Sequence, residues 1–121
     1  MTVRCLDEAA AIELLMATDG VVLLAFGFPG LRATSALDVT LAALAEEFRD
    51  SAVIARVLLD EKSTIGKAYG VDALPTAILF RGGVEIGRLE GLKPPHNYVI
   101  ALESALLAPP GADGIRYLDT G

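Results

Sequence analysis

The sequence predicts one α/β domain whose central sheet is parallel in its first half and antiparallel in its second. Two continuous apolar runs, at residues 21–26 and 53–59, are separated by a long helical pattern. This order is typical of a parallel strand-helix-strand unit. Further along, Gly82-Gly83 stands between two strand-like runs, which indicates a hairpin. We therefore expect a mixed sheet in which the parallel strands come first and the antiparallel hairpin comes last.

The first elements are a short strand and a helix. A β-prone stretch at 3–6 precedes Asp7, which can cap a helix that Asp19-Gly20 ends. Residues at helical spacing predict its buried face, and these are Ala11, Ile12, Leu15 and Met16.

The unbroken apolar run at 21–26 predicts a strand that is buried on both faces. Residues 27–30 interrupt it, and a helix over about 33–49 follows with its apolar residues on one side. The second buried strand, at 53–59, comes next.

The rest of the domain is a short helix, a hairpin and a last helix. Ser63 can cap the short helix, which Gly70 ends, and strands at 77–80 and 84–89 form the hairpin. Pro94-Pro95 opens the last helix. We expect a domain over 1–107 and a C-terminal tail over 108–121.

Composition and charge exclude several function classes. The 121 residues include 16 acidic and 10 basic side chains, a net charge of −6, so nucleic acid and an anionic membrane surface are not expected as partners. No apolar run approaches a membrane span, and acidic residues stand where a secretory signal would be apolar. We expect a cytoplasmic protein, whose 53% hydrophobic content would also suit a homo-oligomer.

Cysteine and histidine are too few for a disulfide framework or a zinc site, because the chain has only Cys5 and His96. We expect no metal and no cofactor. Cys5 lies on the first strand, remote from the expected site, and a buried cysteine usually behaves as a small hydrophobe. The sequence does not decide whether Cys5 is exposed.

Several short sequence motifs occur at positions where one known family has equivalent motifs. They are Asp60 at the end of a strand, residues 69–76 (Tyr-Gly-Val-Asp-Ala-Leu-Pro-Thr), the hairpin at 79–83, and Gly91. Because of these motifs, the chain resembles the thioredoxin family over roughly residues 3–107. The resemblance implies a thioredoxin-like α/β three-layer sandwich with a mixed central sheet of four to five strands. It also implies a cis bond between Leu74 and Pro75.

The chemical groups of that family are missing. The resemblance places its Cys-x-x-Cys at Leu31 and Thr34, its two tryptophans at Gly27 and Gly30, and its buried acid at Ala25. No thiol remains where the family has its dithiol. The resemblance therefore implies a redox-inactive member, and we expect no catalytic residues and no enzymatic activity.

Without the dithiol, the feature of the family that the resemblance still implies is a surface that binds another protein. The loop after the first buried strand is apolar, and in the family the residue before the cis proline exposes its backbone to an extended peptide. The candidate binding residues are Phe28, Pro29, Leu31, Leu74, Pro75 and Gly91.

The main hypothesis is a non-catalytic thioredoxin-like module, an accessory factor or chaperone that binds another polypeptide. It is similar to hydrogenase expression accessory proteins, whose partner is a hydrogenase subunit, and to thioredoxin-like co-chaperones, which hold unfolded clients. The sequence does not decide between these two partners. The alternative is a protein related to thiol-disulfide oxidoreductases that uses Cys5 or a partner's thiol. A third hypothesis is a structural subunit of a larger complex.

Overall fold

The computed structural model describes residues 3–60 and 63–107, and the predicted tail at 108–121 lies outside them. Within the described residues the chain forms five strands and four helices. In chain order they are β1 (Arg4–Leu6), α1 (Glu8–Ala17), β2 (Val21–Gly27), α2 (Arg32–Glu47), β3 (Ala52–Leu58), α3 (Ile65–Ala68), β4 (Thr76–Arg81), β5 (Val84–Glu90) and α4 (Pro95–Leu107).

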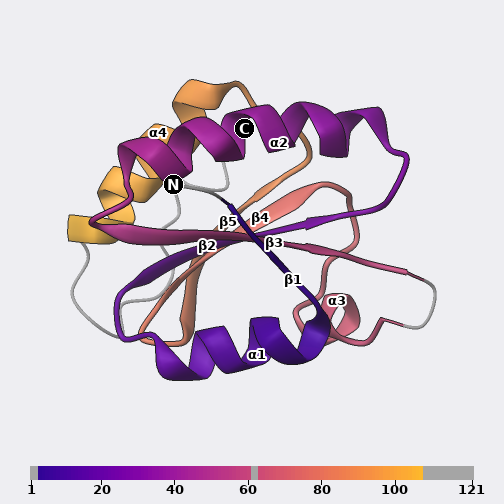
Figure 1. The fold of residues 1–121 in the computed structure, drawn as a ribbon, viewed down its shortest axis with the longest axis horizontal. Helices are drawn as coiled ribbons and strands as arrows, with labels where there is room; N and C mark the ends of the chain where they lie inside the picture. The colour runs from indigo at the N-terminus through magenta and orange to yellow at the C-terminus, as the bar shows by residue number, and fades with distance from the viewer. Residues whose placement is uncertain (1–2, 61–62, 108–121) are drawn as a thin grey trace.

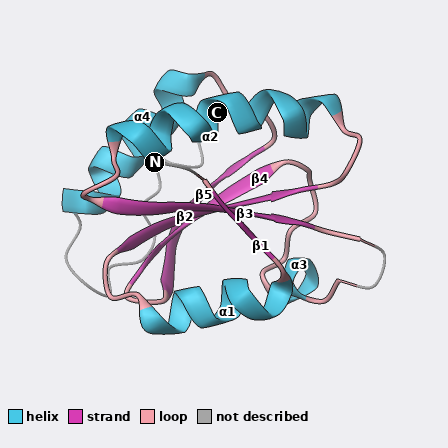
Figure 2. Ribbon diagram, in the orientation of Figure 1, coloured by secondary structure: helices cyan, strands magenta, loops and turns pink. Residues whose placement is uncertain are grey.

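The sheet has the strand order β1-β3-β2-β4-β5. β3 is parallel to both β1 and β2, β4 runs antiparallel to β2, and β5 runs antiparallel to β4. Figure 2 shows these strands between two layers of helix. The predicted α/β sandwich with a mixed sheet is confirmed, with five strands in the described residues.

Both faces of the sheet are covered, α2 and α4 lying on one and α1 and α3 on the other (Figure 1). Each face has its own apolar cluster. Leu23 and Ala25 of β2 belong to the cluster under α2 and α4, whereas Val22 and Leu24 belong to the other. All seven residues of β2 are buried, because alternate side chains enter opposite layers.

The buried face of α1 differs from the predicted one. Asp7 caps the helix as expected, accepting a hydrogen bond from the N–H of Ala10 at 2.8 Å. Ala11 and Leu15 are buried, but Ile12 is exposed and Met16 is 82% exposed. Each residue advances about 100° around a helix, so neighbouring apolar residues lie on different lines along it. Only the line nearest the sheet is covered.

The last helix is held by a buried tyrosine and by an arginine. Tyr98 is fully buried, and its hydroxyl oxygen accepts a hydrogen bond from the N–H of Lys93 at 3.1 Å. Burial raises the pKa of Tyr98. At the other end of α4, Arg81 donates to the carbonyl oxygens of Ala105 and Leu106 at 3.1 and 3.2 Å. These bonds satisfy carbonyls that a helix end leaves unpaired.

Candidate functional site

Three connections meet at one edge of the sheet, where the parallel strands end. Phe26 of β2 pairs with Thr76 of β4, so the loop after β2 and the loop before β4 lie at the same edge. The N–H of Gly91 donates to the carbonyl oxygen of Pro75 at 2.8 Å, which brings in the loop after β5. We call residues 28–31, 74–75 and 91–92 the loop face. The connection from β2 to α2 is at the right of Figure 1.

The structure brings the predicted binding residues to this edge but exposes them unequally. Phe28 and Leu31 are 39% and 38% exposed, and Pro29 is exposed as well. Leu74 is half-buried and its side chain packs on the core, while Pro75 is buried. The bond between them is cis, as the resemblance implies. Leu74 and Pro75 can therefore offer backbone more than side chain to a partner.

Two apolar residues at the same edge were missing from the predicted set. Leu58 pairs with Gly27 in the register of β3 and β2, and Leu92 follows Gly91. Both are exposed, to about the same extent as Phe28. Leu58 was hidden inside an apolar run that reads as buried throughout. Leu92 could have been found, because an apolar residue between Gly91 and Lys93-Pro94 stands in a loop.

The helix start at this edge breaks the usual rules of helix stability. Leu31 is the N-cap of α2, no side chain caps the helix, and its first turn contains no acidic residue. Polar N-caps are preferred because they accept from the free N–H groups, and Arg32 is a cation at the positive end of the helix dipole. The exposed Leu31 therefore does not stabilise α2. Such departures are expected at functional sites.

At the positions of the family's dithiol the structure has no sulfur. Thr34 is buried, and its Oγ1 accepts a hydrogen bond from the N–H of Phe28 at 3.2 Å. Ala25, at the position of the family's buried acid, is also buried. This arrangement cannot perform dithiol exchange, which needs one thiol to attack and a second to resolve the mixed disulfide.

Cys5 is exposed, a point that the sequence leaves open. It is on β1, an edge strand that β3 separates from β2. Its sulfur accepts a hydrogen bond from Nε of Arg56 at 3.2 Å, and the same guanidinium lies 2.5 Å from Oδ2 of Asp38. The hydrogen bond to this sulfur is the largest cause that raises the pKa of Arg56, and the charge of Asp38 raises it further. Among the strands of the described residues, β1 lies at the edge of the sheet and has a neighbour on one side only.

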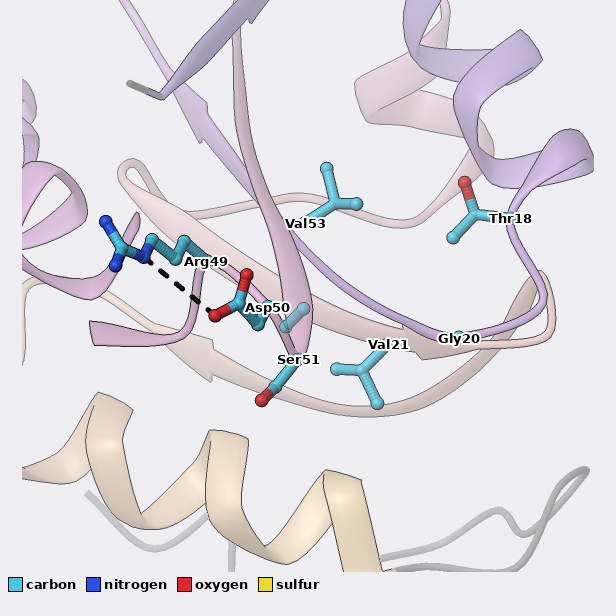
Figure 3. A pocket seen from close by; sticks show the side chains of 8 residues that line it. Thr18, Gly20, Val21, Arg49, Asp50, Ser51 and Val53 are labelled. Carbon is cyan, nitrogen blue, oxygen red and sulfur yellow. Dashed lines mark ion pairs between the residues drawn. The ribbon is translucent and has the colours of Figure 1, made fainter. Parts of the chain in front are cut away.

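A shallow hollow of about 220 Å³ lies at the opposite edge of the sheet, where β2 and β3 begin (Figure 3). Its charged residues, Arg49 and Asp50, form an ion pair with 3.9 Å between Nε and Oδ2. Both side chains are largely exposed, and such pairs bind little because water screens them. The hollow offers no set of polar groups that converge on a ligand.

Within residues 3–60 and 63–107, no three His, Cys, Asp or Glu side chains are grouped so that they could hold a metal ion. None of the helices in these ranges is long and apolar enough to cross a membrane.

Fold and site together define a thioredoxin-like domain without the dithiol. The family described as "Hydrogenase-1 expression protein HyaE" matches residues 3–98, and the chain belongs to this family. Membership supports an accessory, thioredoxin-like role in hydrogenase expression.

The chain is also similar to thioredoxins. The chain is 26% identical to thioredoxin from Porphyra purpurea over 106 residues, which cover 88% of this chain and 95% of that protein. Shorter matches to other thioredoxins span between 38% and 48% of those relatives.

Solved thioredoxin structures have the same fold. The thioredoxin of Malassezia sympodialis superposes with a TM-score of 0.76 at 20% identity, covering 87% of this chain and 91% of that one. A mutant thioredoxin from Halobacterium salinarum superposes with a TM-score of 0.75 at 25% identity, covering 88% and 95%.

Proposed function

We propose that this chain is a non-catalytic protein-binding module that holds a polypeptide at its loop face. The observation that carries the proposal is Leu31, an exposed apolar residue at a helix N-cap where a polar residue would stabilise the helix. A side chain that costs local stability and faces solvent is explained when a partner covers it.

The neighbours of Leu31 support the same conclusion. Phe28 and Leu92 are exposed apolar side chains in two of the connections at this edge, and Leu58 is an exposed apolar side chain at the end of β3 beside them. Apolar residues gathered in this way are typical of contact sites between proteins. The backbone of Leu74 makes no hydrogen bond to other described residues, so an extended segment could pair with it.

The first candidate partner is a hydrogenase subunit, because the family is described by hydrogenase expression. The second is an unfolded client. No catalytic residue, cofactor or metal enters this proposal.

The test measures binding to two defined probes: the hydrogenase subunits of the source organism, and reduced carboxymethylated lactalbumin as a permanently unfolded client. Phe28→Ala and Leu31→Ala should each weaken binding about thirtyfold, since truncating an interface anchor commonly costs ~2 kcal/mol. The melting temperature should change little, because both side chains are exposed.

Met16→Ala and Val39→Ala are matched controls, because both remove exposed apolar side chains outside the loop face. They should leave binding unchanged. Binding that survives the loop substitutions but is abolished by changes at Glu46 and Glu47 of α2 would show that the partner uses another surface.

The alternative function, thiol chemistry through Cys5, has one observation in its favour. Cys5 is exposed, so a partner can reach its sulfur, which accepts a hydrogen bond from Nε of Arg56. If Cys5 acts on a partner, Cys5→Ser should abolish partner capture and Phe28→Ala should not. The binding module predicts the reverse.

A further inference from the structure

Thr34 is a buried polar residue whose hydroxyl makes a hydrogen bond to a loop and does not cap its own helix. It lies in the first turn of α2 and is 7% exposed. A threonine that caps a helix accepts from N–H groups two or three residues further along. Oγ1 of Thr34 instead accepts from the N–H of Phe28, six residues earlier, at 3.2 Å.

The backbone beside Thr34 is shaped to receive it. A Cβ atom placed on Gly27 would lie 2.6 Å from Cγ2 of Thr34 and 3.0 Å from Oγ1. Real Cβ atoms do not come so close, so β2 approaches Thr34 only because residue 27 has no side chain. Gly27 and Thr34 therefore form one fitted contact at the base of the loop.

Backbone hydrogen bonds hold the loop elsewhere. The carbonyl oxygen of Gly27 accepts from the N–H of Leu59 at 2.7 Å, and that of Phe28 accepts from the N–H of Leu31 at 3.3 Å. At the helix start, Ser35 donates to the carbonyl oxygen of Leu31 at 3.2 Å. Among the described residues, the bond to Thr34 is the one side-chain bond that holds the Phe28 backbone.

We propose that Thr34 is a positioning residue of the loop face, holding Phe28 and Leu31 in the conformation that meets the partner. This inference rests on the proposed function above. A loop that is already ordered loses less conformational entropy when it binds, so its affinity is higher. The residue at the second thiol position of the family thus orders the site without reacting.

The experiment compares Thr34→Val, which keeps the shape and removes the hydroxyl, with Thr34→Ser, which keeps the hydroxyl. Amide hydrogen exchange of Phe28 is measured by NMR, with the Leu59 amide as reference. Affinity is measured for the hydrogenase subunits of the source organism and for reduced carboxymethylated lactalbumin. If Thr34→Val does not fold, Thr34→Ala takes its place.

In Thr34→Val we expect the Phe28 amide to exchange roughly tenfold faster, with the Leu59 amide unchanged. The affinity of Thr34→Val for the probe that the wild type binds should fall about tenfold. In Thr34→Ser, the exchange rate of the Phe28 amide and the affinity should both stay close to the wild-type values. The inference is overturned if Phe28 exchange does not change, or if exchange rises while affinity stays the same. A wild type that binds neither probe overturns the proposed function and the binding part of this inference. The exchange comparison still decides whether Thr34 holds the loop.

Discussion

At the end of β2, Gly27 and Thr34 fit against each other because one of them lacks a side chain. The φ angle of Gly27 is not positive, so the position does not need glycine for its backbone conformation. What requires glycine there is the methyl group of Thr34. The constraint is steric and depends on the contact between two residues, which no local sequence pattern reveals.

Gly27→Ala should therefore destabilise the protein by about 1–3 kcal/mol, the usual cost of forcing extra volume into a packed site. Gly27→Ala with Thr34→Ala should recover part of this loss, because the nearest remaining side-chain atom would be the Thr34 Cβ at 3.3 Å. Urea denaturation measures both. Gly20→Ala is the matched control, since a Cβ there meets nothing within 4 Å. A Gly27→Ala protein as stable as this control would contradict the fitted contact.

At the scale of elements, α3 depends on charged side chains from other parts of the fold. It has four residues, too few to be stable alone. At its N-terminus, Oε1 of Glu8 accepts from the N–H of Thr64 at 2.6 Å, from the Thr64 hydroxyl at 3.1 Å and from the N–H of Ile65. Beyond its other end, Arg88 donates to the carbonyl oxygens of Tyr69 and Gly70 at 2.6 and 3.2 Å. α3 leads into the loop that contains Leu74 and Pro75.

The bond from Ile65 is the largest cause that lowers the pKa of Glu8. A carboxylate with a lowered pKa stabilises the folded state above its unfolded pKa, and this contribution is lost as pH falls. Glu8→Gln should therefore lower the melting temperature at pH 7 and make it less sensitive to pH below about 5. Glu13→Gln, a change of an exposed glutamate on the same helix, is the control. Equal melting curves for both variants from pH 7 to acid would show that Glu8 does not hold α3.

The start of α2 gives a second prediction at this scale. Leu31→Asp should raise the stability of the protein by about 0.5–2 kcal/mol, because aspartate caps the free N–H groups and its charge complements the helix dipole. The same change should weaken partner binding, since it removes an exposed apolar contact. Thermal melting and the binding assay measure the two effects. A variant that gains stability and keeps full binding would contradict the role given to Leu31.

At the scale of the whole molecule, one thiol cannot complete a disulfide reduction cycle. Cys5 is the only cysteine among 121 residues, so a mixed disulfide formed on it has no second thiol in the chain to resolve it. In an insulin reduction assay with dithiothreitol, the protein should not accelerate the reaction above the blank. Acceleration that Cys5→Ser removes would favour the thiol alternative, and acceleration that survives Cys5→Ser would contradict both functions.

The sequence determined the order of strands and helices and the hairpin, and the resemblance to thioredoxins located the positions where the dithiol is lost. These are local properties. An unbroken apolar run such as 21–26 indicates a strand with both faces covered, and a thiol is either present at a position or absent. Residues from all three connections at the site could also be named from the sequence, because each connection is contiguous in the chain.

Only the tertiary structure decided which apolar residues are left uncovered and which distant residues fit together. Leu58 is apolar and belongs to a strand that reads as buried, but it is exposed at the end of β3. Ile12 is apolar and at helical spacing with buried residues, but it is exposed on α1. The contact of Gly27 with Thr34 depends on how closely a helix approaches a strand. Periodicity indicates the side of an element on which a residue lies. Burial depends on how far a neighbouring element extends over that side, and this distance is set by packing across the whole fold.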